Sequence, residues 1–332
     1  MTARELWFDG HRHVTVAETE LPCPGPGQVL VETVASAISA GTELLFYRGI
    51  VQGKVAVDAT LKSLGPKPDY PIRYGYASVG VVREAGDGVD PRLRGGLVFS
   101  FSPHASAFLA AADEVLPVPA GVSPEDAAFL ANMETAVTLV LDGQPGLHDR
   151  VSVFGLGVVG LCTTALLARF PLARLRAYDP IVRRREAASA LGAEAREAPG
   201  PETMTEDLVF ELTGSADALG SAVAAAAYSG LVVIGSWYGT QPFVSGLEAA
   251  GANTAFHRGR VRILSSQVST IDPSLSGRWD RRRRLSAAWA ELRVIRPSRW
   301  VTHRVPLDRA EEAYALLAQG RCEAIQVLLV PA

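Results

Sequence analysis

Residues 151–179, VSVFGLGVVGLCTTALLARFPLARLRAYD, decide how this chain folds. The stretch opens with VSVF, which suits a buried parallel strand, and passes through a glycine-rich turn into an apolar helix. It closes on a second short strand, residues 175–178, and on Asp179. A lone G-x-G-x-x-G is a weak signal, but its place between a strand and a helix predicts a dinucleotide-binding loop. The alternative is an ordinary βαβ unit with incidental glycines.

The predicted loop consists of Gly155, Leu156, Gly157, Val158, Val159 and Gly160. Gly155 makes the tight turn, Gly157 lets the backbone approach a pyrophosphate, and Gly160 lets the helix close on the sheet. Free N–H groups and the dipole at the N-terminus of the helix favour an anion there. We therefore expect this loop to hold the pyrophosphate of a dinucleotide.

Asp179 indicates which dinucleotide binds. It follows Gly155 at about the 20-residue spacing expected of the acid that binds the adenine ribose hydroxyls. Its carboxylate would repel a 2′-phosphate, so the sequence favours NAD over NADP. Arg183, Arg184 and Arg185 leave the alternative open, because an arginine here could bind a 2′-phosphate; of these, we count Arg184 among the cofactor-binding residues.

Length and composition bound the class of protein. The chain has 332 residues, enough for about two domains, and 48% of them are hydrophobic. A formal net charge of −3 argues against a nucleic-acid or membrane-surface partner. Cys23, Cys162 and Cys322 are few and scattered, which excludes a disulfide framework. Because no run of residues suits a signal peptide or a membrane span, we expect a soluble cytoplasmic protein with a small-molecule substrate.

The pattern of secondary structure changes along the chain. Up to about residue 130, short strands broken by Gly and Pro suggest an antiparallel, barrel-like domain. Ser123 is a suitable N-cap for a helix that starts at Pro124 and runs through Ala136. Strands are expected at residues 14–18, 28–35, 77–84, 97–101, 114–117, 207–212, 231–235, 261–264 and 324–330, and further helices at 217–228, 281–294 and 310–318. The arginine run 281–284 is expected to form a solvated helix face.

Four segments resemble the medium-chain dehydrogenase/reductase superfamily: SAGTE at 39–43, GYASVG at 75–80, Met133-Glu134 and the glycine loop. The resemblance covers essentially the whole chain. It implies an α/β fold, with a Rossmann doubly wound parallel sheet and a GroES-like, mostly antiparallel β-barrel domain. The implied domains are 1–132 (GroES-like), 133–268 (Rossmann) and 269–332 (return to the first). SAISAGTE and GYASVG also resemble the branch that contains bacteriochlorophyllide 3-hydroxyethyl dehydrogenase.

The resemblance implies that the usual catalytic zinc is missing. Zinc members carry a cysteine where this chain has Ala40, and Gly-His-Glu where it has Gly75-Tyr76-Ala77. A zinc site needs about three S, N or O ligands, and only Glu134 falls at a family ligand position. An unusual site built from His104, Glu43 and Glu134 is the less favoured alternative, so we expect no metal.

Without zinc, other groups must stabilise charge on the substrate oxygen. The resemblance places Thr42, Tyr76 and His104 in one cavity, and we expect His104, near its mouth, to be the terminal proton donor. Alternatively, these residues are a turn threonine, a core tyrosine and a structural histidine. Glu134 could be a base or could pair with an arginine. Phe101 is expected to line the substrate pocket.

Two turns follow the strands 231–235 and 261–264, where ligands of such sheets bind. Ser236, Trp237 and Gln267 are expected to contact the cofactor, and Tyr238 the substrate; the alternative for all of them is loop packing. The favoured function is a zinc-free, NAD(H)-dependent interconversion of a secondary alcohol and a ketone on a medium-sized, cyclic or sugar-like substrate. The alternatives are a zinc-free quinone or enoyl reductase, or an inactive nucleotide-binding protein. The apolar edge 261–264 suggests a homodimer or homotetramer.

Overall fold

The computed structural model describes residues 1–51, 70–238, 252–319 and 322–331. The chain divides into two compact units. The first unit comprises Met1–Ala131 and Leu292–Ala332, and the second comprises Asn132–Glu291. Within the described ranges, no helix is long and apolar enough to cross a membrane.

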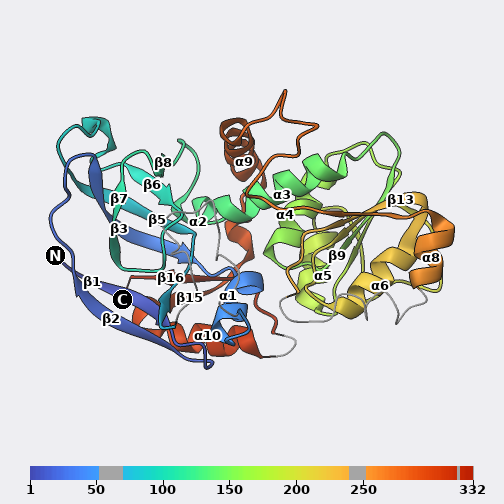
Figure 1. The fold of residues 1–332 in the computed structure, drawn as a ribbon, viewed down its shortest axis with the longest axis horizontal. Coiled ribbons are helices and arrows are strands. Elements are labelled where there is room, and N and C mark those ends of the chain that lie inside the picture. Colours follow the sequence, from blue (N-terminus) through green and yellow to red (C-terminus); the bar gives the residue numbers. More distant parts are fainter. Residues whose placement is uncertain (52–69, 239–251, 320–321, 332) are drawn as a thin grey trace. The chain divides into compact units, whose positions relative to one another are not determined.

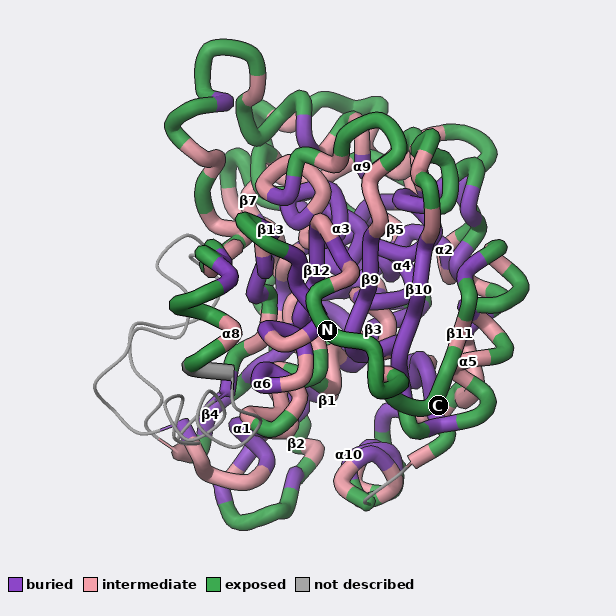
Figure 2. The backbone as a smooth tube through the Cα atoms, turned by 90° about the vertical axis from the view of Figure 1, so that its right-hand side faces the viewer, coloured by how far each residue is buried: buried purple, intermediate pink, exposed green. Residues whose placement is uncertain are grey.

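The second unit contains a six-stranded sheet in the order β11-β10-β9-β12-β13-β14, with every neighbouring pair parallel. Its strands are β9 (Arg150–Phe154), β10 (Arg174–Tyr178), β11 (Glu194–Arg196), β12 (Glu206–Glu211), β13 (Ala226–Ile234) and β14 (Arg262–Ser265). Its helices are α4 (Val158–Leu167), α5 (Val182–Ser189), α6 (Ala216–Ala225) and α8 (Ala252–Gly259). The strands β9 and β10 are buried along most of their length (Figure 2). From β9 the strands are added first toward β11 and then, from β12, on the opposite side of β9. The point between β9 and β12 is therefore the switch point at which such folds bind dinucleotides.

The first unit is built mainly of antiparallel sheet (Figure 1). A seven-stranded sheet has the order β15-β16-β3-β5-β6-β8, with β7 paired to β3, and a three-stranded sheet has the order β2-β1-β4. The strands are β1 (Thr2–Phe8), β2 (Val14–Glu20), β3 (Gln28–Ala37), β4 (Ile72–Arg73), β5 (Ser78–Ala85), β6 (Leu97–Ser100), β7 (Ala107–Ala111), β8 (Val115–Pro117), β15 (Val301–Pro306) and β16 (Gln326–Val330). The helices are α1 (Ala40–Tyr47), α2 (Pro124–Ala127) and α10 (Ala310–Ala318), with short 3-10 turns at Pro91–Leu93, Pro297–Trp300 and Leu307–Arg309.

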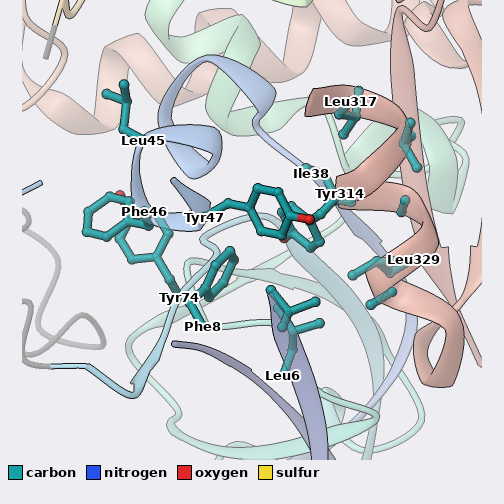
Figure 3. Packing of buried hydrophobic residues seen from close by; sticks show 14 of the residues in the cluster. Leu6, Phe8, Ile38, Leu45, Phe46, Tyr47, Tyr74, Tyr314, Leu317 and Leu329 are labelled. Atoms are coloured by element: carbon teal, nitrogen blue, oxygen red, sulfur yellow. The ribbon is translucent and has the colours of Figure 1, made fainter. Parts of the chain in front are cut away.

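Helices α1 and α10 share a core with β1 in the first unit (Figure 3). The ring of Tyr314 on α10 packs edge-on against Phe8, with centroids 5.1 Å apart, and stacks on Tyr47 at 5.6 Å. Phe46 stacks on Tyr74 with centroids 4.0 Å apart. This aromatic packing fixes the position of α1, which carries the SAGTE segment.

Several predicted elements differ from the observed ones. The predicted helix 217–228 ends at Ala225, because the next residues already pair as the start of β13. The helix predicted from Pro124 is two helices, α2 and then α3 (Leu130–Gly143). Ser123 does cap α2, since its hydroxyl accepts the Asp126 N–H at 3.1 Å. The sequence did not predict the helices α1, α5 and α8 or the strands β1, β4, β7, β11 and β15.

The second unit also extends beyond the predicted boundary at residue 268. Three contacts hold residues 266–291 within it: Ser266 donates to Asp142 at 2.6 Å, Arg284 binds Glu134, and Arg169 binds Glu291. The contact that involves Arg284 lies at the start of α9 (Arg281–Ile295). Arg284 is buried, so the prediction that the arginine run is wholly solvated is wrong at this residue.

Candidate functional site

The glycine loop of the second unit lies between β9 and α4, and each glycine meets a different constraint. Gly155 has φ +88°, and a Cβ there would lie 2.7 Å from the carbonyl oxygen of Leu212. A Cβ on Gly160 would lie 1.9 Å from the carbonyl oxygen of Gly155. A Cβ on Gly157, the N-cap of α4, would have nothing within 4 Å. The loop is therefore closed by backbone contacts on two sides and leaves open space at Gly157.

The remaining loop residues support this shape. Leu156 is buried, while Val158 and Val159 begin α4 and are partly exposed. The N-terminus of α4 has no side-chain cap, so its N–H groups can bind an anion such as a pyrophosphate. The loop thus fits the group for which its sequence is typical.

Asp179 follows β10 and is tied to the glycine loop. One carboxylate oxygen accepts the N–H of Leu156 at 2.8 Å, and the other accepts the N–H of Ile181 at 2.9 Å. The guanidinium of Arg184 lies 3.7 Å from the first of these oxygens. A carboxylate offers about four acceptor positions, so lone pairs remain for ribose hydroxyls. Asp179 therefore has a structural role in the loop as well as the predicted one.

The turn after β13 brings Ser236 and Tyr238 against Glu211, the last residue of β12. The hydroxyl of Tyr238 donates to the buried Glu211 carboxylate, and burial next to that carboxylate raises the pKa of Tyr238 far above 10. Ser236 accepts the N–H of Gly214 at 2.9 Å. Tyr238 was predicted to line the substrate pocket; the structure places it in the core of the second unit, with its hydroxyl occupied by Glu211. Sequence reasoning missed Glu211.

Trp237 and Gln267 lie at the carboxyl ends of β13 and β14, as their order in the sequence predicts. Trp237 is 42% exposed. Gln267 is exposed, and its side-chain oxygen accepts the N–H of Ser269. Both side chains lie at the sheet edge where dinucleotides bind, and their contact with a cofactor stays a prediction.

In the first unit, Tyr76, Thr42 and Ser39 form what we call the hydroxyl cluster. The hydroxyl of Tyr76 donates a hydrogen bond to Ser39 Oγ and lies 3.4 Å from Thr42 Oγ1. All three residues are partly exposed, so a small molecule can reach them. Ser39 was not predicted. The signal for it was its place as N-cap of a helix that the sequence did not reveal.

His104 was predicted to lie near the mouth of a cavity, but it is buried and 0% exposed. Its Nδ1 is bonded to Ser36 and its Nε2 lies 3.0 Å from Glu43, so neither nitrogen is directed to solvent. Gly75 makes room for the imidazole, because a Cβ at that glycine would lie 2.5 Å from the ring. The partly exposed Phe101 packs edge-on against Phe99 at 5.0 Å.

Glu134 was expected to act as a base or to pair with an arginine, and the structure gives the second arrangement. Arg284 donates to one oxygen of Glu134 from two nitrogens, at 2.7 and 3.1 Å, and both side chains are buried. Burial raises the pKa of Glu134, and Arg284 opposes that shift. Arg284 also donates to the carbonyl of Thr270 at 3.2 Å.

The residues at the family's zinc-ligand positions do not fit a zinc ion. Ala40 has no donor atom, the Tyr76 hydroxyl is bonded to Ser39, and the Glu134 carboxylate is bonded to Arg284. Over residues 1–51, 70–238, 252–319 and 322–331, no group of three or more His, Cys, Asp or Glu side chains is arranged to hold a metal.

Comparison with known proteins gives distant relatives. No family model matches the sequence. An uncharacterized zinc-type alcohol dehydrogenase-like protein of Escherichia coli is 24% identical, over 97% of each chain. A D-guloside 3-dehydrogenase of the same species is 27% identical, over 67% of this chain and 66% of the enzyme.

Solved structures of dehydrogenases share the fold over nearly the whole chain. An Escherichia coli alcohol dehydrogenase in complex with NADH is 18% identical with a TM-score of 0.75, covering 99% of both chains. A Sinorhizobium meliloti zinc-binding dehydrogenase bound to NADP is 19% identical with a TM-score of 0.76, covering 100% of both. The predicted α/β fold class, a Rossmann sheet with a GroES-like β domain, is thus confirmed. The chain is thus similar in sequence to alcohol dehydrogenase-like proteins and similar in fold to dehydrogenases of known structure.

Proposed function

We propose that this chain is an NAD(H)-dependent oxidoreductase that interconverts a secondary alcohol and a ketone without zinc. The relatives support the coarser statement, an NAD(P)-dependent dehydrogenase acting on alcohols. The likeness to a D-guloside 3-dehydrogenase favours a sugar-like or cyclic substrate. The single observation that carries the zinc-free mechanism is the hydroxyl cluster, in which Tyr76 stands where zinc members have a histidine ligand.

The second unit holds the cofactor in this proposal. Gly157 and the N-terminus of α4 would hold the pyrophosphate, because the space at Gly157 is open and the first N–H groups of α4 have no side-chain cap. Asp179 would accept hydrogen bonds from the adenine ribose, and its negative charge would disfavour the 2′-phosphate of NADP. Bound NAD(H) supplies the hydride acceptor or donor.

In this proposal, the hydroxyl cluster of the first unit donates the proton to the substrate oxygen. When a ketone accepts a hydride, negative charge develops on its oxygen, and a positioned O–H group both stabilises that charge and donates a proton. We assign this donor to Tyr76, because His104 is buried with both ring nitrogens bonded. Ser39 and Thr42 can then turn their hydroxyl protons toward the phenolate oxygen.

The test combines cofactor titration, a substrate panel and metal analysis on the same purified protein. NADH and NADPH affinities are measured by fluorescence, and turnover is assayed with cyclitols, sugars, quinones and enones. Oxidation of a secondary alcohol with NAD, by protein that holds far less than one zinc per chain, supports the proposal. Turnover of quinones or enones alone favours the reductase alternative, and nucleotide binding without turnover favours an inactive protein. Stoichiometric zinc bound through Glu134 refutes the zinc-free mechanism.

We also propose that the protein is a homodimer, or a tetramer built from dimers. In the described part of the second unit, β14 ends the sheet and pairs on one side only, with β13. Its Ile263 and Leu264 are partly exposed, and an unpaired edge of this kind favours pairing with a second copy. Light scattering at micromolar concentration should give at least the dimer mass; a monomer would contradict this.

A further inference from the structure

A chain of buried hydrogen bonds in the first unit runs from the carbonyl oxygen of Ser102 to the carboxylate of Glu43. Ser78 Oγ lies 3.1 Å from that carbonyl oxygen and 3.2 Å from Ser36 Oγ. Ser36 Oγ is bonded to Nδ1 of His104, whose Nε2 lies 3.0 Å from Oε2 of Glu43. All of these side chains are buried, so we expect each of their polar hydrogens to be used in a hydrogen bond within this series.

The number of available protons fixes the direction of each bond. A backbone carbonyl only accepts, so Ser78 uses its single hydroxyl proton on the carbonyl of Ser102. If Ser36 uses its single proton in the contact with Ser78, its oxygen is left as the acceptor for His104. Nδ1 of His104 then carries a proton.

The carboxylate of Glu43 accepts hydrogen bonds from the hydroxyl of Tyr314 and from the backbone N–H of Ser39 at 2.8 Å. Nε2 of His104 lies 3.0 Å from the same carboxylate. Burial and the Glu43 charge raise the pKa of Tyr314 well above 10, so the phenol keeps its proton and donates it. Hydrogen bonds to the charged form of a carboxyl group favour that form. An ionised Glu43 can only accept, so Nε2 of His104 would then be the donor in their contact.

We propose that Glu43 and His104 form a buried carboxylate–imidazolium pair at neutral pH, and that this pair positions the hydroxyl cluster. The pair has no net charge. A neutral imidazole beside an ionised Glu43 would instead leave one uncompensated negative charge in a core where both residues are 0% exposed, which is strongly unfavourable.

The pair acts on the hydroxyl cluster through Ser39. Glu43 holds the backbone N–H of Ser39, and the Ser39 side chain makes no capping bond to α1. Its hydroxyl is therefore available to Tyr76. The packing of Tyr314 against Phe8 keeps the carboxylate in place (Figure 3). The catalytic consequence of this arrangement rests on the proposed function, whereas the protonation state does not.

Other titratable groups on the packed elements leave the charge of the pair unchanged. Tyr314 faces it as a neutral phenol, because burial and the Glu43 charge raise its pKa well above 10. Glu5 on β1 is bonded to Arg73, and Glu311 on α10 accepts from Tyr47 at 3.2 Å.

The direct test is a nitrogen NMR spectrum of the full chain labelled with 15N-histidine. The signal of His104 is assigned by its loss in His104→Gln, and long-range proton–nitrogen spectra are recorded from about pH 6 to pH 9. We expect both ring nitrogens of His104 to be protonated at about pH 8. One protonated and one unprotonated nitrogen at that pH would overturn the proposal, whether or not a substrate is known.

Two serine variants form a matched pair that tests which groups donate in the hydrogen bonds from Ser78 to His104. Ser78→Ala frees the Ser36 proton for Nδ1 of His104, so the second imidazole proton should leave at a lower pH than in the parent. Ser102→Ala removes a hydroxyl that bonds Ser100 at 2.8 Å but keeps the carbonyl that orients Ser78. It should leave the spectrum of His104 unchanged. Equal behaviour of the two variants would contradict this assignment of donors.

The positioning role is tested by a double-mutant cycle once a substrate turns over. Glu43→Gln should lower the single-turnover rate at least tenfold in the parent and less than twofold in Tyr76→Phe, with NADH affinity unchanged in both. Equal losses in both backgrounds would show that Glu43 only supports the fold. Failure to find any substrate would count against the proposed function and leave the NMR result standing.

Discussion

The glycine loop of the second unit and the hydroxyl cluster of the first are two different kinds of site. The loop is one run of sequence, residues 155–160. Its shape depends on glycines, because a Cβ atom at Gly155 or Gly160 would collide with the backbone. The hydroxyl cluster and the groups behind it come from α1, the segment before β5, the segment before β7, and α10. They depend on hydrogen bonds between residues far apart in the chain. Only the first kind of site can be recognised in a single stretch of sequence.

The largest effect is expected where a buried side-chain pair loses one partner. Arg284→Met should lower the free energy of unfolding by about 3–5 kcal/mol, because it leaves the Glu134 carboxylate buried and unpaired. Denaturant unfolding measures the loss, and Arg282→Met, on the exposed side of the same helix, is the control. A loss no larger than that of the control would contradict this account of the pair.

The pH dependence of that variant is a separate prediction. Burial raises the pKa of Glu134 above 4.5 and Arg284 opposes the shift, so removing the arginine should raise the pKa further. Between the pKa of Glu134 in the unfolded state and its higher pKa in the folded state, the folded protein binds a proton that the unfolded chain has lost. The free energy of unfolding therefore falls as the pH rises through this range. Arg284→Met should therefore be closer to the parent in stability at pH 5 than at pH 8; the reverse order would be inconsistent with an unpaired carboxylate.

The second effect distinguishes the glycines of the loop. Gly160→Ala places a Cβ 1.9 Å from the Gly155 carbonyl oxygen, so it should lower both thermal stability and NADH affinity, the latter at least about 100-fold, or about 2.8 kcal/mol. Gly157→Ala meets no protein atom within 4 Å. It should keep the parent's melting temperature and still weaken NADH binding. Unchanged binding in Gly157→Ala would show that the pyrophosphate lies elsewhere.

The smallest effect concerns the choice of cofactor. NADH should bind at least about tenfold more tightly than NADPH, a difference of about 1.4 kcal/mol. Asp179→Asn keeps an oxygen that can accept the Leu156 N–H but removes the charge that repels a 2′-phosphate. The difference should shrink in this variant, measured by fluorescence titration. Equal affinities in the parent would refute the role of Asp179.

The sequence predicted those parts of the molecule whose signals are local. Alternation of strand and helix around G-x-G-x-x-G predicted β9, α4 and β10, because period and turn chemistry lie within one window. β7, with the sequence AFLAA, has no alternation of apolar and polar residues and was missed. Its strand character comes from pairing with β3.

The side-chain site was predicted only in part, for the same physical reason. Thr42 and Tyr76 were identified by resemblance, and their contact with Ser39 needed the fold. His104 was expected at the mouth of a cavity. Its burial could not be predicted, because no local sequence pattern shows that Ser36 and Glu43 contact its ring. Tyr238 was expected in a substrate pocket. Its hydrogen bond to Glu211 could not be predicted from the sequence, because Glu211 lies on a different strand.

The central claim is that a hydroxyl group, rather than a metal ion, acts on the substrate oxygen. The most direct measurement is single-turnover ketone reduction by the parent and by Tyr76→Phe, with metal content determined on the same samples. The account predicts a rate lowered by about 10²–10⁴ in Tyr76→Phe, unchanged NADH affinity, and far less than one zinc per chain in both. A nearly full rate in Tyr76→Phe, or activity that requires stoichiometric zinc, would contradict it.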